Sequence, residues 1–169
     1  MVSLEANKWA SHSTMKVDRD RHRLVALQST LVALSGYDTE AATTMEFGNP
    51  WGTDSTGWVL NEERLPYGSA RSCAIKISPE EIMFTGGGYG NARGNTAAYN
   101  LNSNSFTILP DMIYERTDHS CALVRGENTS AGVLVAGGRI AYDETLSSTE
   151  FFDFATQAWI EVRATYLSP

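Results

Sequence analysis

Three stretches of the chain share one order of hydrophobic and polar positions. Each begins with an apolar run that ends on glycine, and continues with a short polar loop, a second strand-like segment and a lone aromatic residue. The apolar runs with their glycines occupy residues 31–36, 82–87 and 133–138. Continuous apolar runs of this length predict short strands that are covered on both faces. Helical periodicity is nearly absent, so the pattern predicts an all-β chain.

The glycine that closes each run recurs at a fixed interval. Gly36, Gly87 and Gly138 are separated by 51 residues in both intervals. The strand-like segments that follow lie at 44–47, 97–100 and 149–153, and the lone aromatic residues are Trp58, Phe106 and Trp159. A period near 50 residues indicates stacked supersecondary units that bury a continuous core. We expect the two tryptophans to pack on the glycine pairs of their own units.

An apolar strand, a glycine doublet, an acidic-aromatic strand and a spaced tryptophan together resemble the kelch repeat. The resemblance runs from Trp9 to Trp159, although Ser35 replaces one glycine and Phe106 replaces one tryptophan. It implies a kelch-type β-propeller segment made of three four-stranded antiparallel blades. The expected units are a leader with an orphan blade strand at 1–21, and blades at 22–66, 67–112 and 113–169.

Three blades are too few to close a ring, because propellers close with about 4 to 8 blades. Each end of the arc would leave one blade face bare. A bare face of ~500 Å² withholds about 12 kcal/mol of hydrophobic stabilisation, which is comparable to the stability of a whole domain. The sequence therefore predicts a partial propeller whose open faces are covered by further blades, by a large complex, or by a second copy that closes a six-bladed ring.

Composition narrows the classes of partner. The chain has 42% hydrophobic and 20% charged residues and a net charge of −7. An acidic balance disfavours binding to nucleic acid, which needs clustered Lys and Arg. No run approaches the ~18 apolar residues of a membrane helix. The stretch from Met1 to Trp9 lacks the features of a signal peptide, so we expect no membrane contact and favour the cytoplasm.

The two cysteines have the same local sequence. Cys73 and Cys121 each lie in Ser-Cys-Ala, which suggests equivalent positions in successive blades. Equivalent positions would be one blade apart, farther than the ~5.5 Å between Cα atoms that a disulfide prefers. We therefore predict buried, reduced thiols. A zinc site with His119 lacks Cys-x-x-Cys spacing, and we expect neither a metal nor a cofactor.

The sequence gives little support for any arrangement of catalytic residues. Asp118, His119 and Ser120 are adjacent, and neighbours on a strand point to opposite faces and cannot form a triad. His22 and His119 hold equivalent repeat positions, as do Glu46 and Glu150, so the repeat architecture accounts for both pairs. Some kelch-like propellers are copper oxidases, but nothing singles out a copper pocket here.

The resemblance also implies where a partner would bind. In kelch propellers of the interaction type, partners dock at one end, on residues after the glycine pair and in the links between blades. Carried over to this chain, the candidate partner-binding residues are Tyr37, Asp38, Tyr89, Arg139, Arg23, Arg71, Arg116 and His119. Arg and Tyr are enriched at interface hot spots. The alternative for the link residues Arg21, Arg71 and Arg116 is that they bond to carbonyls and tie adjacent blades together.

These observations lead to one principal hypothesis about function. The chain is expected to be a non-catalytic protein–protein interaction or scaffold module, part of a larger propeller or assembly. The alternatives are a structural subunit of a large complex or a half-propeller that closes as a homodimer. Part of a kelch-fold enzyme, of the copper oxidase or isomerase type, has the least support.

Overall fold

The computed structural model describes residues 13–49, 57–88, 91–125 and 131–162. In these residues the regular structure is β, apart from one 3-10 turn at Ala41–Thr43. Three four-stranded antiparallel sheets and one two-stranded hairpin account for the strands. The all-β prediction is therefore confirmed. The orphan strand expected at Trp9 and the candidate residue Tyr89 lie outside the described residues.

Each sheet is one blade. Blade 1 contains β1 (Arg23–Leu27), β2 (Thr30–Leu34), β3 (Met45–Gly48) and β4 (Trp58–Leu60). Blade 2 contains β5 (Cys73–Lys76), β6 (Glu81–Thr85), β7 (Thr96–Asn100) and β8 (Ser105–Leu109). Blade 3 contains β9 (Ser120–Val124), β10 (Gly132–Ala136), β13 (Thr149–Asp153) and β14 (Ala158–Glu161), with the hairpin β11 (Arg139–Ala141) and β12 (Glu144–Thr145) inserted before β13.

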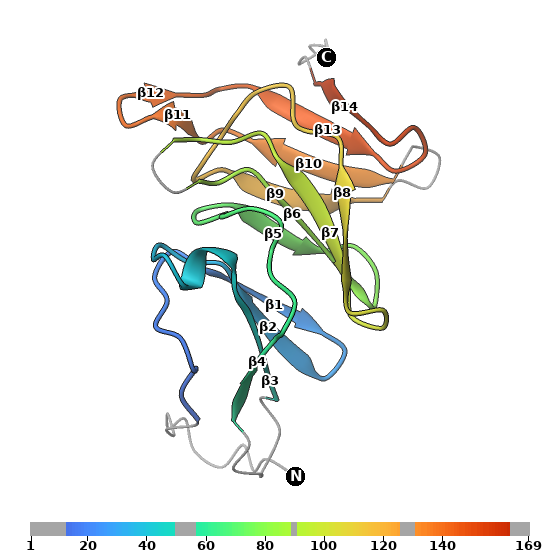
Figure 1. Ribbon diagram of the computed structural model, residues 1–169. Coiled ribbons are helices and arrows are strands. Elements are labelled where there is room, and N and C mark those ends of the chain that lie inside the picture. Colours follow the sequence, from blue (N-terminus) through green and yellow to red (C-terminus); the bar gives the residue numbers. More distant parts are fainter. Residues whose placement is uncertain (1–12, 50–56, 89–90, 126–130, 163–169) are drawn as a thin grey trace, which may run out of the picture.

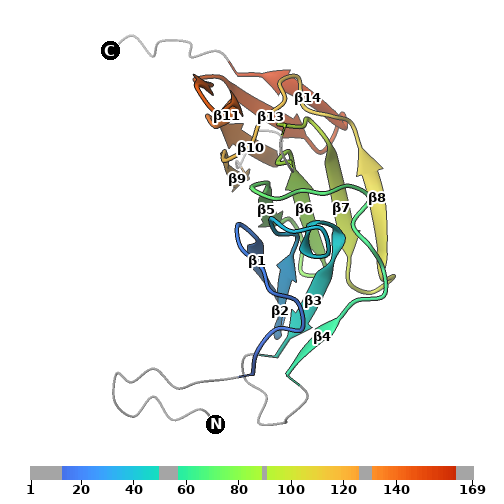
Figure 2. The ribbon, with the colours of Figure 1, turned by 60° about the vertical axis from the view of Figure 1, so that its left-hand side comes forward.

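The blades stack face to face along an arc (Figure 1). Figure 2 shows the first strands β1, β5 and β9 side by side along one edge of the arc, and the last strands β4, β8 and β14 along the other. Strand order within every blade follows this radial direction, with β9, β10, β13 and β14 in blade 3. The molecule is thus a partial β-propeller with three blades.

Strand register shows which residues are equivalent between blades. Trp58, Phe106 and Trp159 are paired with Gly48, Tyr99 and Phe152, so the three lone aromatic residues hold one position, as predicted. Their packing differs from the prediction. The Trp58 ring lies against Gly48, where a Cβ atom would be 2.9 Å from it, and the Trp159 ring contacts Phe152 with centroids 5.2 Å apart. The tryptophans therefore pack on their partner strands rather than on the glycine doublets.

Side chains alternate between the two faces of each strand, and the buried ones form two hydrophobic cores. One lies between blades 1 and 2 and the other between blades 2 and 3. Val32 of blade 1 and Met83 of blade 2 hold one repeat position and point to the following blade, with exposures of 0% and 1%. Leu134 holds the same position in blade 3 but is only half-buried, because no further blade within the described residues covers it. Blade 3 thus ends the arc with an uncovered apolar face.

The two cysteines form a disulfide, so the prediction of reduced thiols is wrong. Cys73 pairs with Thr85, directly before the glycine doublet, whereas Cys121 pairs with Val135, one position farther from its doublet. Neighbouring positions on a strand point to opposite faces. Cys73 therefore faces blade 3 and Cys121 faces blade 2, and their Cα atoms lie 5.9 Å apart across the interface. The shared Ser-Cys-Ala sequence concealed this one-residue offset.

Candidate functional site

Polar side chains gather at the end of the blades where the glycine doublets lie. At this end each link turns into the first strand of its blade through a residue with positive φ. These residues are Arg21, Arg71 and Asp118, with φ of 51°, 59° and 55°. Their amides and carbonyls join the links: Arg71 N donates to Arg21 O at 3.1 Å, and Asp118 N donates to Arg71 O at 2.9 Å. The repeated backbone therefore sets these three side chains in sequence along the arc.

The side chains make one continuous series of contacts across all three blades. The Tyr37 ring lies between two guanidinium groups, with Arg21 Cζ 4.5 Å and Arg71 Cζ 5.3 Å from its centroid. The Asp118 carboxylate lies between the same Arg71 and a third guanidinium group, 3.9 Å from Arg71 and 2.7 Å from Arg139. Arg139 Nε also donates to Asp118 at 2.9 Å. We call Arg21, Tyr37, Arg71, Asp118 and Arg139 the arginine row.

The side chains of the arginine row hold one another in place but remain partly exposed to solvent. The side chains of Arg71, Arg139 and Asp118 are 23%, 26% and 39% exposed. The exposed ring of Tyr142 extends the series beyond Arg139, whose Cζ lies 5.6 Å from its centroid. Arg21, which is 43% exposed, lies 3.4 Å from the carboxylate of Asp20. Three guanidinium groups are thus partly exposed to solvent, beside the carboxylates of Asp118 and Asp20. A surface of this kind can accept carboxylates, carbonyl oxygens and aromatic rings.

Not all of the predicted binding residues belong to this surface. Tyr37, Arg71 and Arg139 are brought together. Asp38 is exposed beside Tyr37 in the chain, and its carboxylate caps the amide of Thr39. Arg23 is half-buried and donates to the carbonyls of Ser72 and His22, tying blade 1 to blade 2. Burial lowers the pKa of Arg23, against an opposing effect of Asp118.

Arg116 is fully buried, which removes it from the candidate binding surface. Its guanidinium pairs with Glu150 at 2.5 Å, and both side chains are 0% exposed. It also donates to the carbonyls of Gly137 and Ser148 at 2.8 and 3.1 Å. The two remaining partners of Glu150 are the amides of Ile113 and Tyr114. Arg116 therefore holds its link to blade 3 through carbonyl bonds, as the alternative for the link arginines proposes.

Blade 1 repeats this arrangement with a residue that the sequence did not single out. Arg19, not Arg21, pairs with Glu46 at 3.0 Å, with both side chains 0% exposed. Glu46 accepts from the amides of Lys16 and Val17, as Glu150 does from its own link. Counting four residues onward from Met15 and Met112 would have found Arg19 and Arg116 as one repeat position. Asp118 could have been found similarly, because it holds the position of Arg21 and Arg71.

His119 is also buried, with 4% of its surface exposed, and so does not belong to the candidate binding surface. Gly86 makes room for its ring, since a Cβ atom there would lie 2.7 Å from His119 Cε1. Within the described residues, neither ring nitrogen has a hydrogen-bond partner. Burial, with Arg116 and Arg23 nearby, lowers the pKa of His119 to about 3, while Asp118 acts in the opposite sense. The imidazole is therefore neutral at pH 7.

This burial predicts a pH dependence of stability. Between about pH 6.5 and 3 the unfolded chain binds a proton at His119 that the folded chain does not. Stability should therefore be complete above pH 6.5 and fall as the pH drops, by up to about 1.4 kcal/mol per pH unit from this group. His119→Gln should flatten this part of the urea-unfolding profile. His22→Gln, at the equivalent place in blade 1, should retain it because His119 is still present.

The described residues show neither a metal-binding cluster nor a membrane-spanning helix. No cluster of three His, Cys, Asp or Glu among them could hold a metal ion. Among the same residues, no helix has the length and hydrophobicity needed to cross a membrane. The arginine row is a series of polar contacts that involves residues of all three blades and their links.

Comparison with known proteins identifies the fold alone. No protein-family model matches the sequence, and no curated protein matches it. The structure is similar to the solved structure of YjhT, with a TM-score of 0.73 and 14% sequence identity. The likeness covers 90% of this chain and 52% of YjhT, so the chain spans about half the length of that protein.

Proposed function

We propose that this chain is a non-catalytic protein-binding module of the kelch type, and that it forms part of a larger propeller or assembly. The glycine-doublet end of the blades is the binding surface, and the arginine row is its centre. Partner residues with carboxylates or aromatic rings fit this row. The proposal rests on the contact series from Arg21 to Arg139, which crosses three blades without interruption.

Two properties of the row support binding over a purely structural role. Its guanidinium groups are held by a ring and a carboxylate, so little side-chain entropy is lost when a partner binds. They are also partly exposed, in contrast to the fully buried arginines that pair with Glu46 and Glu150. Arg and Tyr in such a setting are typical of interface hot spots.

Affinity capture with matched variants tests this proposal. We expect proteins retained by the wild-type chain to be lost when Arg71 and Arg139 are both replaced by alanine, with affinity reduced by about 30-fold or more. Lys76→Ala removes a cation at the opposite end of blade 2 and should retain them. Equal affinities for the wild type and the double variant, measured with a captured and purified partner, would rule out the arginine row as the binding centre.

A second candidate is a half-propeller that closes as a homodimer. The uncovered face around Leu134 and the 52% coverage of YjhT favour it, because a second copy would supply the missing blades. Light scattering separates the two candidates. A mass of about 37 kDa, twice the 18.5 kDa of one chain, supports closure by self-association, and a mass of one chain contradicts it.

A further inference from the structure

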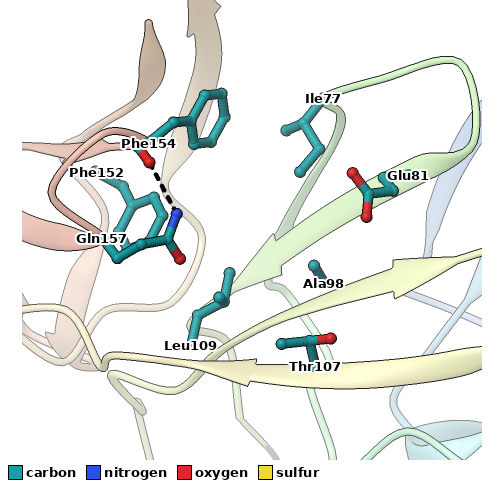
Figure 3. A pocket seen from close by; sticks show the side chains of 8 residues that line it. All are labelled: Ile77, Glu81, Ala98, Thr107, Leu109, Phe152, Phe154 and Gln157. Atoms are coloured by element: carbon teal, nitrogen blue, oxygen red, sulfur yellow. Dashed lines mark hydrogen bonds between the residues drawn. The ribbon is translucent and has the colours of Figure 1, made fainter. Parts of the chain in front are cut away.

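A pocket opens between blades 2 and 3, on the side away from the disulfide. Its cavity volume is about 340 Å³, which lies within the range of small-molecule sites. Figure 3 shows Ile77, Glu81, Ala98 and Thr107 of blade 2 on one wall, Phe152, Phe154 and Gln157 of blade 3 on the other, and Leu109 between them. Two different blades therefore supply facing walls.

The pocket exists because blade 2 has a small residue where blade 1 has a large one. Phe47 pairs with Val32 and Ala98 pairs with Met83, so Phe47 and Ala98 hold one repeat position. Between blades 1 and 2 the Phe47 ring reaches Tyr99, with centroids 6.0 Å apart, and fills this space. Between blades 2 and 3, the methyl group of Ala98 leaves the space in front of Phe152 open.

The lining is apolar except for a few polar groups. Glu81 supplies the one charged side chain among the lining residues, and its Oε1 accepts from Asn100 Nδ2 at 3.2 Å. None of the salt bridges among the described residues involves Glu81. Gln157 Nε2 is occupied by the carbonyl of Phe154 at 3.0 Å. Lys76 and Arg125 line an adjoining cleft that shares Ile77 with this pocket, and Arg125 Nη2 donates to the Ile77 carbonyl at 2.8 Å.

We propose that this pocket binds a small amphiphilic cation, with a ring-sized apolar body against Phe152, Phe154 and Ala98 and an ammonium group toward Glu81. The apolar walls match the body of such a ligand, and the carboxylate is an acceptor that a protonated amine satisfies. An anion of the same shape would meet Glu81 with like charge. The site is independent of the arginine row, which lies at the other end of the strands.

Two probes with the same phenethyl body and opposite charge test the proposal on the intact chain. Binding of phenethylammonium and of 3-phenylpropionate is followed by amide shifts in NMR titrations. We expect phenethylammonium to shift the amides around Ala98 and Gln157, and 3-phenylpropionate to leave them unchanged. Absence of shifts with the cation, or equal shifts with both probes, would overturn the proposal.

Three variants locate the two parts of the ligand. Ala98→Phe installs the residue that blade 1 has at this position and should abolish binding. Glu81→Gln retains the shape of the side chain and should weaken binding about tenfold through loss of the charge-assisted bond. Glu80→Gln, outside the pocket, should leave the affinity unchanged. Unaltered affinity in folded Glu81→Gln would contradict the ammonium subsite, whether or not Ala98→Phe folds.

Discussion

Replacing Cys73 and Cys121 together by serine should lower the free energy of unfolding by about 4 kcal/mol. The bond joins residues 48 apart, and cross-linking a loop of this length removes that much conformational entropy from the unfolded chain in the loop-closure estimate. Urea unfolding with and without a thiol reductant measures the effect. The wild type should lose stability on reduction.

The double-serine variant is the control for this prediction, because it should not respond to the reductant. Serine is close in size to cysteine, so the packing between β5 and β9 is largely kept. If the wild type unfolds at the same urea concentration in both conditions, the two thiols are not bonded in solution, and the offset between Cys73 and Cys121 has no energetic role.

The disulfide also bears on where the protein functions. Disulfides form and persist in oxidising compartments and are rare in the cytosol. The bond therefore weighs against the cytoplasmic location that the sequence alone favours.

Breaking the buried ion pair of blade 3 should have an effect of similar size. Arg116→Met should destabilise the fold by about 3–5 kcal/mol, because it leaves the carboxylate of Glu150 buried without its counter-charge. The two amides that bond to Glu150 only partly compensate. Thermal and urea unfolding of the single variant measure this loss, and a change below about 1 kcal/mol would contradict it.

Blade 2 provides the design of a compensating variant. At the positions of Arg116 and Glu150, blade 2 has Ser69 and Ala97, both 0% exposed. Blade 2 therefore lacks both partners of the ion pair. Pro66 holds in blade 2 the position of Ile113, whose amide donates to Glu150. Proline has no amide hydrogen, so blade 2 has no donor to satisfy at this position. Arg116→Ser with Glu150→Ala should therefore cost less than the sum of the two single changes. Adding Ile113→Pro removes one more unpaired donor.

The sequence predicted the parts of the fold that depend on spacing. Equal intervals between Gly36, Gly87 and Gly138 give the number of blades, and the apolar runs give their second strands. It did not predict the disulfide, since local similarity around the cysteines hides a shift of one residue in register. A single shift reverses the direction of a side chain on a strand.

The candidate site was predicted in part, for a comparable reason. Tyr37, Arg71 and Arg139 were identified by their places relative to the doublets and links. Asp118, which joins Arg71 to Arg139, was considered only as a member of a catalytic triad. Arg116 and His119 were predicted because their residue types and repeat positions match those expected for partner binding, but both side chains are buried. Whether a link side chain points to solvent or into the blade depends on packing that spacing alone does not specify.

The disulfide cross-links two of the three blades. Blades 2 and 3 are joined through Cys73 and Cys121, whereas blade 1 is attached to blade 2 by side-chain packing, by the connecting chain and by the hydrogen bonds of Arg23 and Arg71. Arg71, Asp118 and Arg139 therefore lie on the two blades that the disulfide cross-links, and Arg21 and Tyr37 lie on the blade without a cross-link. A tilt of blade 1 would change the distance between Tyr37 and Arg71 and leave the Asp118 contacts intact, so the disulfide fixes the geometry of the proposed binding surface at one end and not at the other.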